Sequence, residues 1–260
     1  MYEEYLVFAK QIALEAGQIM KDFFNQDYEA HYKSDNTIVT EADTKINELV
    51  IKRIKEKYID HGIYGEEASF NKEKKMLWVC DPIDGTSMFS RGVPVAVFSL
   101  AFVVDGVPQV GVVYDPFTDS LYEAVKGYGV KCNGKSISVN DYDLNAKEST
   151  IGYDYSPTMP FNTTDAIYPL SNKCRIGGTG SFVHNAILVA NGGFSCAVTS
   201  GDRPYDIAAI KVIVEEAGGK VTDLNGKEQR YDREILGAVI SNGLVHENLI
   251  EILRDSAAAK

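Results

Sequence analysis

Two aspartates flank a proline and an isoleucine in the segment Asp81–Thr86, which directly follows an apolar run. The apolar residues Leu77–Cys80 predict a buried strand, and Pro82 predicts a bend where that strand ends. Carboxylate and carbonyl oxygens at such a bend can converge on a hard cation such as Mg²⁺. Asp-Pro and Asp-Gly are also ordinary turn signals, so this segment alone favours a metal site only slightly over a simple turn.

Two further groups of acidic residues strengthen the hypothesis of a metal site. Glu66 and Glu67 precede the strand, and Asp206 lies far downstream, just before a helical segment. Carboxylates from such separated segments can hold a small group of magnesium ions while leaving positions open for water and substrate. As alternatives, Asp206 could cap the helix that follows it, and the two glutamates could be solvated loop charges.

Small and hydroxyl-bearing residues beside these carboxylates could bind phosphate. Gly85 would let the backbone approach a phosphate closely, and Thr86 and Ser87 would supply amide hydrogens and hydroxyls if a helix begins there. Metal ions at the carboxylates would polarise phosphoryl oxygens and lower the pKa of an attacking water. The combination predicts metal-assisted hydrolysis of a phosphate ester without a phosphorylated enzyme intermediate.

The periodicity of apolar residues predicts the elements that must position this chemistry. A polar connector at Lys33–Thr37 separates two amphipathic helices. Strands follow these helices in the first part of the chain, and strands alternate with helices in the second part. The predicted helices are Tyr2–Phe24, Ile46–Ile54, Gly180–Ala190 and Ile207–Ala217. The predicted strands are Val95–Val104, Val110–Tyr114, Leu121–Val125, Ile137–Val139, Thr150–Tyr153 and Phe194–Val198. This order predicts two units, residues 1–144 with the metal and phosphate motifs and residues 145–260 with Asp206.

Composition predicts an ordered globular chain. Of its 260 residues, 45% are hydrophobic and 24% are charged, and no low-complexity tract interrupts them. The net charge of -11 argues against nonspecific binding to nucleic acid or to an anionic membrane. Because we find neither a leader sequence nor a membrane-spanning run, we expect a cytoplasmic protein. The four dispersed cysteines predict buried free thiols rather than disulfides.

The order of the acidic motifs resembles that of the inositol monophosphatase family, in the segments Val39–Asp43, Gly65–Glu67, Trp78–Thr86 and Tyr205–Ala209. The later run Glu215–Val221 is similar to the segment that usually follows the family's last aspartate. The resemblance implies an α+β fold, a layered αβαβα sandwich of two α/β subdomains with the site between them. It also implies a homodimer that requires Mg²⁺ and is inhibited by lithium.

The resemblance further implies a role for each acidic residue. Two or three magnesium ions would be held by Glu66, Asp81, the carbonyl of Ile83, Asp84 and Asp206. In the family, the residue that matches Asp81 bridges two ions. Glu66 and Ile83 would join it at one ion, and Asp84 and Asp206 at another, while Glu67 would support the cluster. The residues that orient and activate the attacking water would be Asp43, Glu66 and Thr86.

The loop Arg175–Ser181 matches the substrate-side loop of the family. With residues near the last aspartate, it gives the predicted substrate contacts Arg175, Gly178, Thr179, Gly180, Thr199 and Arg203. Thr199 stands where the animal enzymes have an acidic residue that contacts inositol hydroxyls, and Met88 and Tyr205 replace the usual asparagine and tryptophan. As an alternative, Gly178 and Gly180 only shape the start of the next helix.

These departures leave the substrate open. Inositol monophosphate is the best candidate, with the 2'-phosphate of NADP and fructose 1,6-bisphosphate as alternatives. A different class of function is a noncatalytic protein that binds RNA-processing or transcription machinery on the same scaffold. The complete acidic set disfavours that class as the sole function, because a scaffold has no chemical need for it.

Overall fold

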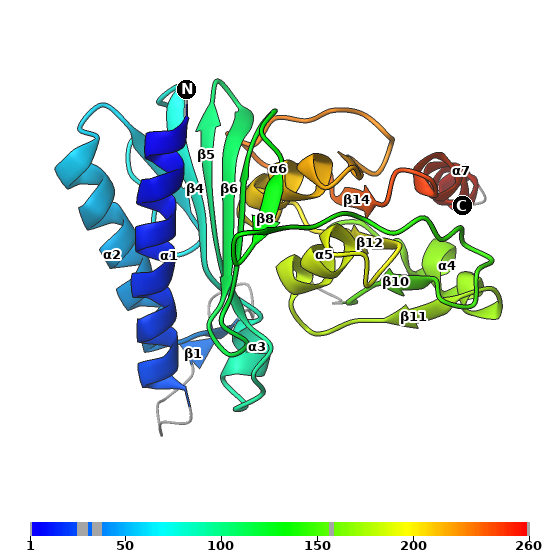
Figure 1. Cartoon of the computed structure of the whole chain (residues 1–260). Helices are drawn as coiled ribbons and strands as arrows, with labels where there is room; N and C mark the ends of the chain where they lie inside the picture. The colour runs from blue at the N-terminus through cyan, green and yellow to red at the C-terminus, as the bar shows by residue number, and fades with distance from the viewer. Residues whose placement is uncertain (1, 25–30, 33–37, 156–158, 259–260) are drawn as a thin grey trace.

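Five layers of secondary structure are stacked in the order helix, sheet, helix, sheet, helix (Figure 1). The computed structural model describes residues 2–24, 31–32, 38–155 and 159–258, so the predicted connector at 33–37 lies outside the described residues. A seven-stranded and a five-stranded sheet form the two inner layers, with one pair of helices between them. This architecture confirms the predicted α+β fold, a layered αβαβα sandwich.

Two long amphipathic helices cover the outer face of the seven-stranded sheet (Figure 1). The helices α1 (Glu3–Phe23) and α2 (Glu41–Lys57) agree with the predicted helices, and each buries one apolar face. The α2 helix begins with a capping box, in which Thr40 and Asp43 exchange hydrogen bonds. This cap fixes Asp43, which is fully buried, at the start of α2. A short hairpin of β1 (His31–Tyr32) and β2 (Ile38–Val39) precedes the cap.

The seven-stranded sheet is antiparallel except at one edge, where β3 and β4 run parallel. Its turn at Asp105 and Gly106 joins β5 to β6. In spatial order the strands are β3 (Gly62–Gly65), β4 (Met76–Asp84), β5 (Val97–Val104), β6 (Val107–Asp115), β7 (Ser120–Val125), β8 (Val130–Cys132) and β9 (Lys135–Ser136).

The prediction of a strand at Ile137–Val139 is wrong. The sheet ends at β9, and the residues that follow it form an irregular segment. Ile137 and Val139 are partly buried against the central apolar core, and the amide of Val139 donates to the carbonyl of Ala217 at 3.1 Å. The alternating apolar residues therefore reflect packing of a connecting segment on the core rather than pairing in a sheet.

The five-stranded sheet mixes parallel and antiparallel pairs. The strand β10 runs parallel to both of its neighbours, β11 and β12, and β14 runs antiparallel to β12 and β13. In spatial order the strands are β11 (Arg175–Gly177), β10 (Thr150–Gly152), β12 (Cys196–Thr199), β14 (Ala238–Ser241) and β13 (Lys220–Thr222). The outer layer beyond them contains α4 (Thr164–Ile167), the 3-10 helix η1 (Tyr168–Asn172) and α7 (His246–Ala258).

Two apolar helices, α5 (Phe182–Ala190) and α6 (Ala208–Glu216), fill the space between the sheets (Figure 1). Both agree with the predicted helices. The central cluster of buried side chains includes residues of both sheets, for example Val113 and Ala197. The division into residues 1–144 and 145–260 stays a proposal. It follows the two sheets, although this buried cluster joins them. All four cysteines are free, and three of them are buried.

The contact between β6 and α6 depends on Gly111. A Cβ atom at this position would lie 2.3 Å from the carbonyl oxygen of Ala209 in α6. Gly111→Ala is therefore expected to lower the free energy of unfolding by about 1–3 kcal/mol, because α6 must move away from the sheet. Denaturant unfolding measures this change. Gly177→Ala, whose Cβ atom meets open space, is the control, and equal stability of both variants would contradict the argument.

None of the described helices combines the length and the apolar character needed to cross a membrane.

Candidate metal centre

The end of β4 carries the two aspartates of the central motif. Asp81 pairs with Ser99 of β5 and Asp84 pairs with Val97, so the register of the two strands shifts between them. Pro82 has no N–H group to donate to β5, which accounts for the irregular pairing. The amide of the next residue donates to Asp81 Oδ1 at 3.0 Å instead. This bulge brings two carboxylates of one strand into the same cluster.

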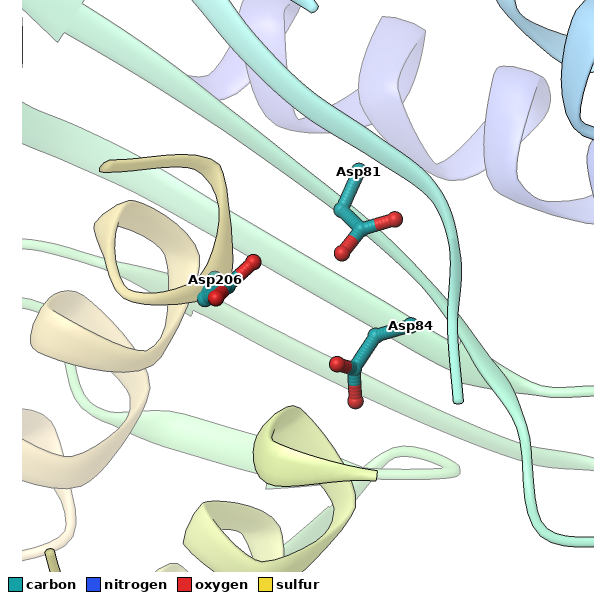
Figure 2. Close-up of side chains that lie close together, drawn as sticks. All are labelled: Asp81, Asp84 and Asp206. Atoms are coloured by element: carbon teal, nitrogen blue, oxygen red, sulfur yellow. The ribbon is translucent and has the colours of Figure 1, made fainter. Parts of the chain in front are cut away.

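Three carboxylates converge from two separate parts of the chain (Figure 2). Asp81 and Asp84 come from β4, and Asp206 comes from the 3-10 helix η2 (Pro204–Asp206), which precedes α6. Oxygen atoms of the three side chains lie within 4.8 Å of one another. Asp81 is 1% exposed and Asp84 is 9% exposed, so the cluster is largely screened from bulk water.

The capping alternative for Asp206 is not observed. The helix α6 has Ile207 at its N-cap position and no side-chain hydrogen bond caps it. Asp206 instead lies in the last position of η2, beside the aspartates of β4 (Figure 2). Its carboxylate is therefore part of the acidic cluster, as the hypothesis of a metal site requires.

Burial perturbs the protonation of all three aspartates. It raises the pKa of Asp81 and of Asp206 well above the usual range, and the charge of Glu66 and of the neighbouring aspartates raises both further. Burial also raises the pKa of Asp84, to about 6, although hydrogen bonds from Ser181 and Val183 lower it. Ionised carboxylates this close repel one another unless a cation lies between them. The buried, oxygen-only donor set fits a hard divalent cation such as Mg²⁺.

The two glutamates follow β3 and lie beside this cluster. The amide of Glu66 donates to the carbonyl of Cys80 at 3.1 Å, which ties the residue after β3 to the neighbouring strand β4. Glu66 Oε1 also lies 3.6 Å from Arg203 Nη1, so the predicted substrate contact Arg203 pairs with a predicted metal ligand. The carboxylate of Glu66 is not among the three that lie within 4.8 Å of one another. Glu67 acts on Asp43, whose pKa its charge raises.

Asp43 and Thr86 lie together, as predicted, although 43 positions separate them in the sequence. The hydroxyl of Thr86 lies 2.8 Å from the carbonyl oxygen of Ile83 and 3.3 Å from Asp43 Oδ1. Burial raises the pKa of Asp43 to about 7, despite the opposing hydrogen bonds from Thr40. A hydroxyl between a carbonyl oxygen and a carboxylate of near-neutral pKa can relay a proton.

The backbone turns sharply at Gly85, which precedes the short helix α3 (Thr86–Phe89). Gly85 has a φ angle of 92°, and a Cβ atom there would lie 2.7 Å from the carbonyl oxygen of Val95. Only glycine fits this position without displacing the backbone. A short helix does begin at Thr86, which meets the condition set for a phosphate site, while a phosphate contact through Gly85, Thr86 and Ser87 stays a prediction.

The predicted substrate-side residues fall into two groups. Gly178, Thr179 and Gly180 form a loop that leads into α5, whereas Arg175 is exposed on the edge strand β11. Thr199 is buried at the end of β12. Its hydroxyl accepts a hydrogen bond from an amide two residues later, at 3.2 Å. The substrate contacts of these residues stay predictions.

Several side chains that support the site were missed by the sequence analysis. Asp154 accepts hydrogen bonds from the amide of Gly180, and Asn185 Oδ1 accepts one from the amide of Thr179, so both hold the substrate-side loop. Arg91 donates to the carbonyl oxygen and hydroxyl of Ser87. The contact of Asp154 is set by the fold, since 26 positions separate it from Gly180, whereas Arg91 lies only four residues after Ser87.

The layered fold and its buried oxygen cluster define a class of metal-dependent phosphatases. The model of the inositol monophosphatase family matches residues 1–258, and the chain belongs to this family. It is accordingly a phosphoric monoester hydrolase.

Relatives within the family carry different names. The chain is 32% identical to a histidinol-phosphatase of Chlorobaculum parvum over 247 residues, which cover 94% of this chain and 95% of that protein. It is 36% identical to a fructose-1,6-bisphosphatase/inositol-1-monophosphatase of Thermotoga maritima over 219 residues, 84% of this chain and 83% of that one. The structure of a Thermotoga maritima inositol monophosphatase has a TM-score of 0.86 and 30% identity, covering 98% and 99% of the two chains.

Proposed function

We propose that this protein is a Mg²⁺-dependent phosphomonoesterase whose substrate is a small phosphorylated metabolite, with inositol monophosphate as the best candidate. The observation that carries the proposal is the buried cluster of Asp81, Asp84 and Asp206 beside the pair formed by Asp43 and Thr86. The cluster fits a divalent cation, and the pair can take a proton from an attacking water.

Two or three magnesium ions would be held by the carboxylates of the cluster together with Glu66 and the Ile83 carbonyl. When bound, magnesium polarises phosphoryl oxygens and lowers the pKa of water, as divalent ions do in other hydrolases. Within this set, Asp81 would act as a ligand together with Glu66 and Ile83, and also together with Asp84 and Asp206.

Side chains of the protein would transfer the proton of the attacking water, and backbone amides would orient the phosphate. Thr86 Oγ1 would accept a proton from water as its own proton passes to Asp43 Oδ1, 3.3 Å away. In the metal-free protein, burial raises the pKa of Asp43 to about 7, so its carboxylate can take up a proton near neutral pH. The backbone at Gly85, Thr86 and Ser87 would donate hydrogen bonds to the phosphate.

Removing the Thr86 hydroxyl is expected to lower kcat about a hundredfold and to change KM by less than about threefold, because the hydroxyl acts on the water rather than on the substrate. Steady-state phosphate release by Thr86→Val measures both constants. Thr44→Val, at an exposed position of α2, is the matched control. Loss confined to KM would contradict the assigned role.

Inositol monophosphate is proposed from the family, whereas two residues of the site favour the alternative substrates. The Thermotoga maritima relative is named for inositol monophosphate and fructose bisphosphate, and the Chlorobaculum parvum relative for histidinol phosphate. Arg203, paired with Glu66, would favour a second anionic group such as that of fructose 1,6-bisphosphate or NADP. Thr199, whose hydroxyl already accepts an internal hydrogen bond, offers inositol no acidic acceptor.

A panel of phosphate esters tests this proposal. Purified protein is assayed with inositol monophosphate, histidinol phosphate, NADP and fructose 1,6-bisphosphate at saturating Mg²⁺, and kcat/KM is compared. We expect the highest value for inositol monophosphate. A higher value for another ester would reassign the substrate, and no phosphate release from any of them would overturn the proposed reaction.

We further propose lithium inhibition, a homodimeric state and a cytoplasmic location, all of which rest on the likeness to the family. Inhibition of phosphate release by LiCl and the mass measured by light scattering test the first two directly.

A further inference from the structure

The carboxylate of Asp84 is bonded to the start of α5, in the second half of the chain. The hydroxyl of Ser181 and the amide of Val183 both donate to Asp84 Oδ2, the latter at 2.9 Å. These donors lie 97 and 99 positions from Asp84 in the sequence. In Figure 2 the side chain of Asp84 lies between the other two aspartates and the yellow-green helix α5.

Ser181 is held in one orientation by its second role. It is the N-cap residue of α5, and its Oγ accepts a hydrogen bond from the amide of His184 at 3.1 Å. The side chain is 1% exposed, and its Cβ lies 2.9 Å from the position that a Cβ atom on Gly85 would take. With its acceptor site occupied by the helix, the hydroxyl directs its hydrogen toward Asp84.

These contacts prepare Asp84 to act as a ligand. Both donors bind Oδ2, which fixes the orientation of the carboxylate beside Asp81 and Asp206. Partners that orient a metal ligand in this way change metal affinity when they are lost.

We propose that Ser181 is a positioning residue for the metal ligand Asp84, and that it sets the affinity of the metal site through its hydroxyl. This inference rests on the proposed function, since it assumes that Asp84 binds a divalent cation. It places one determinant of metal binding in α5, outside the acidic motifs, so that the metal site is completed only when the second half of the chain packs on β4.

Metal binding measured without substrate tests this role. Mn²⁺ is titrated by calorimetry into the full-length, metal-free protein. Ser181→Ala is expected to raise the dissociation constant between about 10- and 100-fold. Ser181→Thr keeps the hydroxyl and is expected to restore binding to within about threefold of wild type. Ser195→Ala removes a buried hydroxyl that bonds to Ser149 in the same half of the chain, and should bind Mn²⁺ as wild type does.

A second variant guards against a folding defect. Glycine is a fair N-cap residue, so Ser181→Gly keeps the start of α5 while removing the hydroxyl, and it should weaken Mn²⁺ binding as alanine does. Wild-type affinity in a folded Ser181→Ala or Ser181→Gly protein would overturn the inference, as would equal weakening in Ser195→Ala. Asp84→Asn separates the two proposals: wild-type binding by this variant refutes the metal site itself, whereas lost binding there with normal binding in the Ser181 variants refutes only the positioning role.

Discussion

Asp81→Asn is expected to lower kcat by about a thousandfold or more while making the metal-free protein more stable. The loss of activity follows because the central carboxylate of the cluster can no longer neutralise the cations that stabilise the transition state, a contribution of several kcal/mol. The gain in stability follows because Asp81 is 1% exposed beside two other aspartates. Its raised pKa reflects the free-energy cost of burying an ionised carboxylate next to other negative charges. Asparagine removes that cost and still offers Oδ1 to the amide of Ile83.

Both effects are measured on one preparation. Phosphate release is followed at saturating Mg²⁺, and thermal unfolding is followed in EDTA, where we expect the free energy of unfolding to rise by more than about 1 kcal/mol. Asp141→Asn changes an exposed aspartate and should alter neither quantity appreciably. Near-normal turnover, or a lower melting temperature in EDTA, would mean that Asp81 does not lie in a metal-binding cluster.

In metal-free protein, the stability is expected to fall as the pH rises from about 4 to about 7. The unfolded chain releases the protons of its aspartates near pH 3.8, whereas in the folded chain Asp84 has a pKa of about 6 and Asp43 of about 7. Between pH 3.8 and these higher pKa values, the folded state binds more protons than the unfolded state, so raising the pH favours unfolding. Each unit of pKa shift corresponds to roughly 1.4 kcal/mol.

Saturating Mg²⁺ should reverse this trend, because the cation binds the ionised carboxylates and displaces their protons. Three histidines, the buried His61 and His246 and the partly buried His184, have lowered pKa values. They act in the opposite direction, because the stability that they contribute is lost as the pH falls. Because the histidines are the same in both proteins, wild type is compared with Asp81→Asn by denaturant unfolding at several pH values in EDTA. We expect the shallower dependence in the variant. Identical slopes in the two proteins would contradict the raised pKa of Asp81.

The proposed metal ligands were accessible from the sequence because most of them lie in short motifs with local causes. A proline interrupts the pairing of a central strand because it lacks an N–H group. The two aspartates around Pro82 were therefore predicted to share the end of β4. The role of Asp206 was less certain, since an aspartate before a helix usually caps it. The resemblance to the family favoured ligation, and the geometry agrees with that choice.

The side chains that hold the proposed metal ligands in place could not be predicted from local patterns in the same way. Ser181 reads as a helix cap, and its second bond to Asp84 exists only because α5 packs on the end of β4. The error at Ile137–Val139 has a related cause. Alternating apolar residues report burial on one side, and a connector lying on the core produces the same pattern as a strand. Local patterns predicted most of the longer elements but not α7, β13 or β14, whereas contacts between distant elements decided which residues meet.

The most direct test of the metal centre is a crystal structure of the protein soaked in MnCl₂, with anomalous scattering used to locate the ions. We predict anomalous peaks between the carboxylates of Asp81, Asp84 and Asp206, with at least one ion also contacting Glu66 or the Ile83 carbonyl oxygen. Manganese bound only elsewhere, with these three aspartates making no metal contact at saturating concentration, would contradict the account.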